Sequence, residues 1–418
     1  MRKATLLALG LALLASMGLA QSGIVYVMHG WPGQQAPAFN KIIQAFNEQY
    51  PNITVVQEII GRDMPAVIAT RMAAGNPPDL ILHPWVGTMR QWADAGEIVN
   101  LAGLVDTSDI NPALVPIGEH AGGLYGLFIF PNVKSLVWYN PKQFAAMGYT
   151  VPTTWDGLEA LSAQIVADGG VPWSIGLESG AASGWPGTDW IEDILLRTAG
   201  AEVYDQWVNH EIPWTDPRVR EAFEVFGKLF DKGYVLGGRI GAITTFFGDA
   251  IDPVIVDPPL AYMHKQATFI QAFMTVEGLV PGVDYAVFPL PGINPEATPD
   301  GSIPLLVSGD VVTAFSARPE VLAFAQFLTS ETASKIWSTE LGELSAYVNA
   351  NPDDFENPIT RLAQEMLLNA SVSRFDGSDL MPGEVGAGAF WVGMMDFASG
   401  EDLDSVLEYI EDVAVDAY

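Results

Sequence analysis

Apolar residues follow two periods over the first hundred residues, one typical of strands and one typical of helices. The pattern predicts a strand, a helix, a strand, a helix and a strand at residues 23–28, 39–46, 53–59, 64–72 and 79–82. Strands alternating with helices indicate a parallel, doubly wound sheet. Ligands of such sheets bind at the carboxyl ends of the strands, and this is where Trp31 and Trp85 are expected.

The helical period returns over much of the remaining chain. Further helices are expected at residues 155–166, 189–199, 219–230, 320–328, 331–340 and 403–413. Short strands are expected at residues 173–177 and 260–263. The helix over residues 219–230 carries a stripe of apolar rings that indicates a core face and needs no ligand.

The first 20 residues combine a short basic start, an apolar run and an end of small residues. This pattern predicts a secretory signal peptide over residues 1–20, cleaved before Gln21. No Cys follows it, so we expect no lipid attachment, and no later apolar run is long enough for direct insertion into a membrane. The rest of the chain is too long for one ordinary core, which favours two domains.

The composition excludes several classes of function. A formal net charge of −31 repels phosphate backbones and anionic lipids, so we expect no nucleic-acid partner. Charged residues are only 17% of the chain, so the acidity does not indicate disorder. The chain has no Cys, which excludes disulfides and thiolate metal sites.

A glycine-rich stretch, Ser371–Met395, gathers the residue types that bind sugars. It contains Arg374, Asp376, Asp379 and Trp391. Charged groups donate to and accept from sugar hydroxyls, and an aromatic ring stacks on the apolar face of a pyranose. We expect a functional surface loop here, with a structural connector as the alternative.

Tryptophan supplies further candidates, because several of the twelve lie next to Gly or Pro at expected strand ends or loops. These candidate stacking residues are Trp31, Trp85, Trp185, Trp190 and Trp391. The alternative for each is a place in the core.

The polar candidates also have structural alternatives. Asp189 either accepts from sugar hydroxyls or caps the helix that is expected to begin there. Arg374 either contacts ligand or pairs with Asp376 and Asp379 inside its own loop. His264 ends an expected strand, where it either faces the cleft or packs.

Enzymatic, cofactor and metal motifs are missing from the sequence. It contains no HExxH, no phosphate-binding GxxxxGK[ST] and no GxSxG, and its GAGAFW string departs from GxGxxG. We therefore expect no catalytic residues, no cofactor and no metal ion.

Several strings occur in the order and spacing of one known family. FNEQYPNITV, RMAAGNPPDLIL, GGLYGLFIF, SLVWYN and GYTVPTTWDGLEAL resemble the extracellular (family 1) sugar-binding proteins of bacterial ABC importers. Within that family, HGWPG, GWPGTDWIEDI and SRFDGSDLMPGEVGAGAFW are most similar to the binders of α-glucosides and disaccharides. The resemblance extends over nearly the whole chain.

The resemblance implies an α/β, two-lobed periplasmic-binding-protein type II fold, with a mainly parallel sheet flanked by helices in each lobe. The chain would cross a Venus-flytrap hinge several times, near residues 131–136, 285–289 and 315–319. Lobe one would then comprise residues 21–134 and 286–316. Lobe two would comprise residues 135–285 and 317–418.

The resemblance also implies a secreted or periplasmic, monomeric binding protein. It would capture an α-glucoside or another small sugar by hinge closure and deliver it to a membrane ABC permease. Two alternatives remain, a secreted glycoside-processing enzyme and a binder of the same fold that holds a polyol, a peptide or another solute. The expected ligand-binding residues are Trp31, Trp85, Trp185, Asp189, Trp190, His264, Arg374, Asp376, Asp379 and Trp391.

Overall fold

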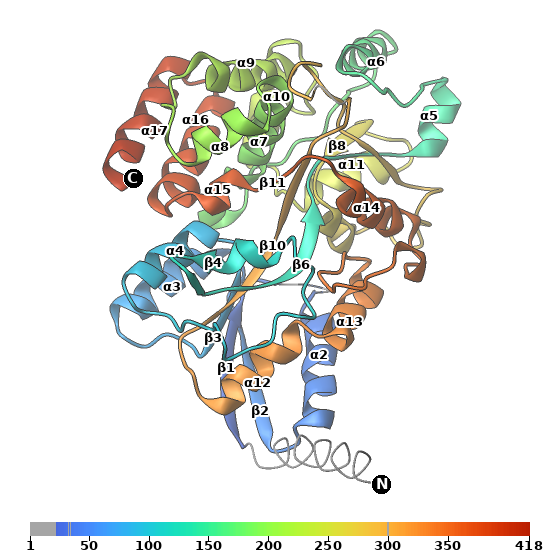
Figure 1. Ribbon diagram of the computed structural model, residues 1–418. Helices are drawn as coiled ribbons and strands as arrows, with labels where there is room; N and C mark the ends of the chain where they lie inside the picture. Colours follow the sequence, from blue (N-terminus) through green and yellow to red (C-terminus); the bar gives the residue numbers. More distant parts are fainter. Residues whose placement is uncertain (1–21, 32, 34, 299–300) are drawn as a thin grey trace.

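The computed structural model describes residues 22–418, except residues 32, 34, 299 and 300. The predicted signal peptide lies outside the described residues. The described chain forms two lobes, drawn one above the other in Figure 1, with an α/β arrangement in each. This two-lobed α/β class is the one that the sequence predicts.

The lower lobe in Figure 1 is built mainly from the first third of the chain and from one later segment. Its elements are β1 (Gly23–His29), α2 (Gln35–Gln49), β2 (Ile53–Ile59), α3 (Met64–Ala73), β3 (Leu80–His83), α4 (Val86–Asp94), β4 (Glu119–His120), β5 (Gly123–Leu124), β6 (Leu127–Val133), β10 (Leu305–Ala314), α12 (Pro319–Leu328) and α13 (Glu331–Leu341).

The remaining elements follow β6 and, later, α13 along the chain. They are β7 (Leu136–Tyr139), α5 (Pro141–Met147), α6 (Trp155–Ala167), α7 (Trp185–Thr198), α8 (Ala201–Val208), α9 (Pro217–Asp231), α10 (Gly238–Thr244), α11 (Asp252–Ile255), β8 (Met263–Lys265), β9 (Ala286–Pro289), α14 (Pro358–Asn369), β11 (Ser373–Phe375), α15 (Gly377–Leu380), α16 (Trp391–Ser399) and α17 (Leu403–Ala417).

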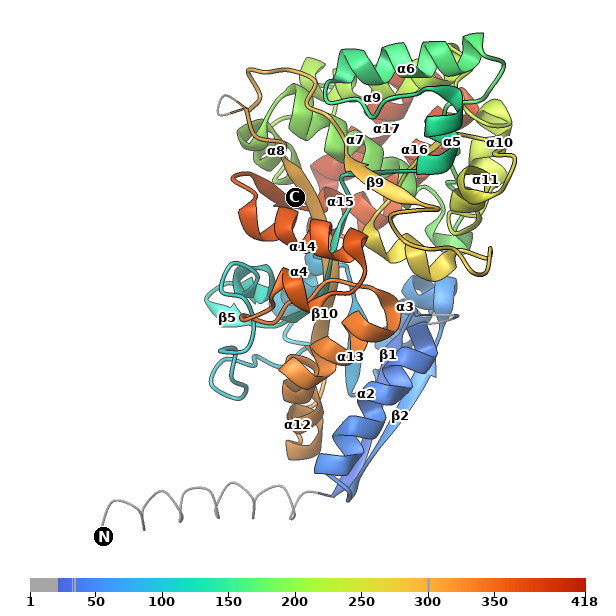
Figure 2. The same cartoon turned by 90° about the vertical axis from the view of Figure 1, so that its right-hand side faces the viewer.

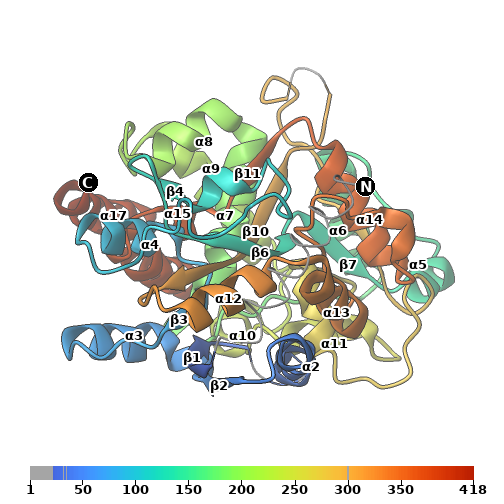
Figure 3. The same cartoon turned by 60° about the horizontal axis from the view of Figure 1, so that its bottom comes forward.

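The first sheet has the strand order β11-β10-β3-β1-β2, and β6 pairs with β10. β1 is parallel to both β2 and β3, which confirms the doubly wound order predicted for the first hundred residues. All four residues of β3 are buried, as expected for a central strand covered on both faces, and β3 pairs in parallel with β1 and antiparallel with β10. Seen from the bottom, α2, α3 and α12 are arranged around β1 and β2 (Figure 3).

The second lobe differs from the mainly parallel sheet expected there. Its three strands have the order β8-β7-β9, and both pairings are antiparallel. Isolated parallel bridges join Trp173 to Val235 and to Met263, where the sequence predicts a strand over residues 173–177, and Glu178 to Phe246. The strands that flank β7 come from later connections, so this sheet is not made of successive strand–helix–strand units.

The chain passes between the lobes at places that only partly match the sequence prediction. β6 belongs to the first sheet and β7 to the second, so Lys134 and Ser135 lie between the two, within the first predicted crossing. The second crossing was expected near residues 285–289, but β9 there pairs with β7 and stays in the second lobe. The chain instead returns along β10, which runs between the two lobes in Figures 1 and 2.

The segment after β10 was expected in the second lobe, but α12 and α13 pack on the first. α12 contacts β1, and α13 contacts α2. The reason is apolar burial, because Phe324 of α12 lies edge-on to Phe39 and Phe46 of α2 with ring centroids 6.2 and 4.8 Å away. Residues 319–341 therefore belong with the first lobe. Later in the chain, β11 pairs with the start of β10 at the edge of the first sheet, and α15 contacts α7 and α8 of the second lobe.

The stretch Ser371–Met395 is mostly helical and is not the open loop that its glycines suggested. β11 and α15 are followed by a π-helix over Glu384–Phe390 and then by α16. A Cβ at Gly386 would lie 1.8 Å from the backbone oxygen of Ser378. The glycine is therefore needed for close backbone packing, and it does not mark a loose segment.

Candidate functional site

A cavity of about 260 Å³ lies between the lobes and is lined largely by aromatic rings. The first lobe contributes Trp31, Trp85, Phe130 and Trp337. The second lobe contributes Trp185, Phe246, Phe247, Phe269, Phe273 and Trp391. A concave, mainly apolar site with a few converging polar groups is the usual form of a small-molecule binding site.

The element ends explain why tryptophans reach this cavity. Trp31 follows β1 and Trp85 follows β3, so both lie at the carboxyl edge of the parallel strands, as predicted. Trp185 and Trp391 are the first residues of α7 and α16. The two helix starts lie in close contact. Gly184 allows this, because any side chain there would place a Cβ 2.1 Å from the backbone oxygen of Trp391.

Three rings of the first lobe form one packed wall of the cavity. Phe130 stacks on Trp337 with centroids 4.0 Å apart and planes 9° apart, and Trp31 lies 4.7 Å from Trp337. Phe130 has a φ of 50°, which is strained for a residue with a bulky side chain. Such strain persists where the surrounding packing fixes a ring in a required place.

Two carboxyl groups lie beside this wall. The Nε1 of Trp31 donates to Oδ2 of Asp310 at 3.1 Å, and burial raises the pKa of Asp310 to about 7. Glu343 is 1% exposed. Its burial, and after that the charge of Asp310, raise the pKa of Glu343 to about 8.

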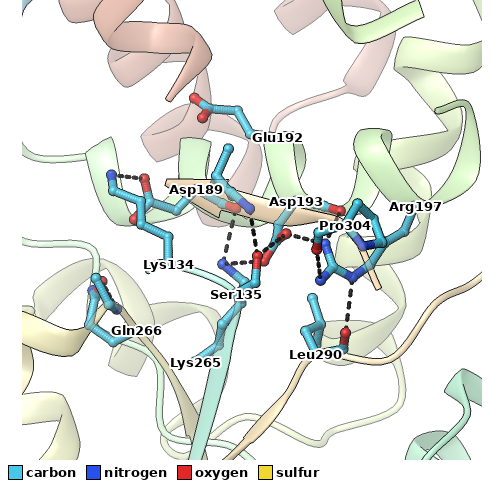
Figure 4. A network of polar contacts seen from close by, with 12 residues as sticks. Lys134, Ser135, Asp189, Glu192, Asp193, Arg197, Lys265, Gln266, Leu290 and Pro304 are labelled. Carbon is cyan, nitrogen blue, oxygen red and sulfur yellow. Dashed lines mark hydrogen bonds and ion pairs between the residues drawn. The ribbon is translucent and has the colours of Figure 1, made fainter. Parts of the chain in front are cut away.

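A buried ion cluster also borders the cavity. Nζ of Lys134 donates to Oδ1 of Asp189 at 2.7 Å and contacts Oδ2 of Asp376, and it lies 5.2 Å from the centre of the Trp185 ring. Figure 4 shows Lys134 beside Asp189. Burial alone would lower the pKa of Lys134, but the charges of Asp189 and Asp376 raise it well above its usual value.

The acids around Lys134 are held by backbone donors. Asp376 caps α15 by accepting from the backbone N–H of Asp379 at 3.1 Å. Glu192 accepts from the backbone N–H of Gly377 at 2.9 Å. Burial, and after that the charge of Asp376, raise the pKa of Asp379, whose side chain lines the cavity.

Carboxylate oxygens of Asp189, Glu192 and Asp376 lie within 4.8 Å of one another, a spacing that would suit a metal ion. The ammonium of Lys134 already neutralises two of these three groups. The donors therefore form an internal salt bridge, and we assign no metal to them.

A second polar network fixes the chain where it enters the second lobe (Figure 4). The hydroxyl of Ser135 donates to Oδ1 of Asp193 at 2.8 Å, and Lys265 lies 3.2 Å from the other oxygen of Asp193. Arg197 pairs with Asp193 and donates to the backbone oxygen of Pro304 at 2.8 Å. The network thus joins the first crossing to the segment that precedes β10.

The structure brings most of the predicted site residues to the cavity. Those that line it are Trp31, Trp85, Trp185, Asp376, Asp379 and Trp391. Asp189 does not line the cavity itself, but it forms an ion pair with Lys134, which does. It is inside α7, whose N-cap is Gly184, so the capping alternative for Asp189 is wrong.

Besides Asp189, three predicted residues do not line the cavity. Trp190 is 2% exposed and packs in the second core, 5.3 Å from the Trp173 ring. His264 is buried, with Nδ1 2.9 Å from the backbone oxygen of Ser174, and burial lowers its pKa to about 4. For both residues the packing alternative describes the observed position.

Arg374 also lies outside the lining. Its Nε and Nη2 lie 2.6 and 2.7 Å from the two carboxylate oxygens of Asp205 on α8. This bidentate pair differs from both sequence-based alternatives, since Arg374 neither lines the cavity nor pairs with Asp376 or Asp379.

Sequence reasoning missed four cavity residues with clear roles in its geometry: Phe130, Lys134, Asp310 and Glu343. Two carried a usable signal, because Lys134 and Asp310 are single charges within apolar strand-like runs. Phe130 and Glu343 carried none, since each reaches the cavity through packing between distant segments.

No helix among residues 22–418, apart from the four residues left undescribed, is long and apolar enough to cross a membrane.

The chain is similar to known proteins over most of its length. Residues 32–335 match the model of a family described as bacterial extracellular solute-binding protein. The osmoprotective compounds-binding protein GgtB of Synechocystis is 38% identical, with 91% of this chain and 89% of that protein covered. The alpha-glucosides-binding periplasmic protein AglE of Rhizobium meliloti is also 38% identical, with 89% of this chain and 82% of that protein covered.

Solved structures share the fold at low sequence identity. A chitin oligosaccharide binding protein superposes with a TM-score of 0.82 at 17% identity and covers 95% of this chain and 99% of its own. The solute receptor AcbH, described as preferring β-D-galactopyranose, has a TM-score of 0.81 at 19% identity with the same coverage. Together with the two-lobed fold, these matches show that the chain belongs to the bacterial extracellular solute-binding protein family, a family of binding proteins and not of enzymes.

Proposed function

We propose that this protein captures an α-glucoside or a related small sugar in the cavity between its lobes and delivers it to a membrane ABC permease. The observation that carries the proposal is the combination of aromatic rings from both lobes with a few buried acids in one interlobe cavity. Sugars have apolar C–H faces that stack on rings and hydroxyls that exchange hydrogen bonds with carboxyl groups.

The names of the relatives support this ligand class. AglE is named for α-glucosides, and it is 38% identical over 382 residues. The structural neighbours add only the shared fold, because their identities lie below 20%.

Ligand capture would proceed by closure of the lobes about the strands that pass between them. We place the hinge at Lys134 and Ser135 and along β10. A sugar bound to one lobe would stabilise the closed form only to the extent that the second lobe adds affinity. The rings on α7 and α16 would supply that addition.

The partners and the location follow from the same proposal. The permease would recognise the closed, ligand-bound shape of a monomer, and the N-terminal signal peptide would export the protein to the periplasm or cell exterior. Sedimentation of the exported protein, with and without sugar, tests the monomer, and N-terminal sequencing tests cleavage before Gln21.

A sugar panel tests the proposed function directly. Purified protein is incubated with trehalose, sucrose, maltose and palatinose, and thermal unfolding and calorimetric titration are measured. A sugar at about 100 times its Kd should stabilise the fold by about 2.7 kcal/mol, and the sugar should be recovered unchanged. Absence of a shift with every sugar would refute sugar capture, and liberated glucose would refute a pure binding role.

One relative favours a second ligand class. GgtB is named for osmoprotective compounds and is as similar to this chain as AglE. Mannitol and glycine betaine therefore belong in the same panel, and a thermal shift from either, without one from the sugars, would favour an osmolyte as the ligand.

A further inference from the structure

Glu343 is a buried acid for which the protein provides no hydrogen-bond partner. It follows Gly342, which ends α13 in the left-handed conformation with a φ of 69°. The side chain lines the cavity, and the residue is 1% exposed. Within the described part of the chain, neither carboxyl oxygen of Glu343 has a hydrogen-bond partner. Such a group costs stability unless a ligand or water satisfies it.

The backbone around Glu343 is fixed from both sides. The carbonyl oxygen of Gly342 accepts from Nε2 of Gln271 at 3.4 Å and from the hydroxyl of Thr360. The backbone N–H of Ser345 donates to Oε1 of Gln364 at 3.1 Å. Hydrogen bonds on both sides of Glu343 therefore fix the backbone that holds its carboxyl group at the cavity wall.

A β-bulge places the second acid beside it. The pairing of β10 with β6 shifts between Ser308 and Asp310, and a bulge redirects the side chain that follows it. Gly309 allows this, because a Cβ there would lie 2.3 Å from the Phe128 ring. Asp310 reaches the cavity. Burial is the larger cause of the raised pKa of Glu343, and the charge of Asp310 is the second cause.

The surroundings of the pair favour a neutral, hydroxyl-rich ligand over a cation. Burial favours the uncharged form of both Asp310 and Glu343, and a carboxylic acid both donates and accepts hydrogen bonds. Lys134, a buried cation, lines the same cavity and repels a second cation. The rings of Trp31 and Phe130 offer an apolar surface next to the two acids.

We propose that Glu343 and Asp310 form a subsite that binds neighbouring hydroxyl groups of the sugar while the apolar face of that sugar residue lies against Trp31. This inference rests on the proposed function, since it assigns a recognition role within the same cavity. Trp31 takes part in two ways, because its Nε1 also donates to Asp310 and fixes which oxygen of Asp310 remains for the ligand.

The test compares Glu343→Leu and Glu343→Gln with wild type by calorimetric titration of trehalose, sucrose, maltose and palatinose. Glu365→Gln, an exposed acid on α14, is the matched control. Glu343→Leu should weaken every disaccharide that wild type binds by about 10- to 100-fold, because it removes a hydrogen-bonding group to the ligand. Glu343→Gln should lose less, and Glu365→Gln should match wild type.

A stability measurement separates recognition from a structural role. Glu343→Leu should unfold at the same temperature as wild type or at a higher one without sugar, because it removes an unpaired buried carboxyl. Mono-deoxy derivatives of the tightest disaccharide add a second readout. The derivative that lacks the recognised hydroxyl should bind wild type more weakly and should show no further loss in Glu343→Leu.

Each other outcome has a defined meaning. Unchanged disaccharide affinity in Glu343→Leu overturns the subsite and leaves sugar capture standing. Weaker binding together with a lower unfolding temperature overturns it in favour of a structural role. A cation site would replace the proposed subsite under one result: wild type binds tetramethylammonium, Glu343→Leu does not, and the two proteins bind disaccharides with equal affinity. A wild type that binds no disaccharide overturns both this subsite and the proposed function.

Discussion

Replacing Lys134 with Met removes the cation from the ion cluster beside the cavity and leaves the carboxyl groups of Asp189 and Asp376 in place. All three groups are almost completely buried, with side chains 2–6% exposed. Breaking a buried ion pair by removing one partner typically costs about 3–5 kcal/mol, because the remaining charge keeps its desolvation penalty without compensation. We expect a loss of unfolding free energy in this range at pH 8.

The loss should depend on pH with a defined sign. In wild type, burial would raise the pKa of Asp376, but Lys134 lowers it below its usual value of 3.8, so the ionised group stabilises the fold above that pH. Without the ammonium, burial raises the folded-state pKa of Asp376 above 3.8. The variant then loses stability as the pH rises, so its deficit relative to wild type should grow between pH 4 and pH 8.

Urea denaturation of both proteins at pH 4, 6 and 8 measures this deficit. Lys142→Met is the matched control, because Lys142 forms an exposed ion pair with Asp284 and should lose far less. Adding Asp376→Asn to Lys134→Met should recover part of the stability. Equal losses in the two lysine variants, or a deficit that does not change with pH, would refute the argument.

Three further predictions concern single side chains. Trp391→Ala should weaken sugar binding by about 1 to 4 kcal/mol in a calorimetric titration, whereas unchanged affinity with lower stability would make Trp391 a core residue. Arg374→Ala should leave affinity unchanged and cost less than about 1 kcal/mol of unfolding free energy, because it breaks only the partly exposed pair with Asp205; a tenfold weaker affinity would contradict this. The folded-state pKa of Glu343 is raised from 4.5 to about 8, so the stability of wild type should fall relative to Glu343→Gln between pH 5 and pH 8, by up to about 5 kcal/mol in urea denaturation. A difference that is constant with pH would show that Glu343 does not hold its proton on folding.

The sequence predicts best those features that depend on local periodicity. The strand–helix order of the first lobe follows from apolar spacing, and it places Trp31 and Trp85 correctly, because the carboxyl edge of a parallel sheet is a consequence of topology. Asp376 and Asp379 were found by composition, although the segment that carries them is helical and closely packed. Glycine indicated flexibility there, whereas the structure uses it for close backbone approach.

Long-range packing decides what the sequence could not show. Trp190 and Trp185 lie five residues apart on one helix, and only the core partners of Trp190, Trp173 and Phe226, distinguish the buried ring from the cavity ring. Arg374 has a partner on α8 that no spacing rule identifies. The prediction that α12 belongs to the second lobe was wrong for the same reason. The apolar face of α12 could pack on either core, and its sequence does not show which one it contacts.

The cavity includes residues of the very strands that join the lobes. Phe130 and Asn132 of β6, Lys134 just after it, and Ser308 and Asp310 of β10 all line it. Rotation about these strands would displace them least, so their contacts with a ligand would exist before closure, whereas those of Trp185 and Trp391 would form afterwards. Substitutions on β6 and β10 should then change mainly the association rate of the ligand. Substitutions on α7 and α16 should change mainly its dissociation rate.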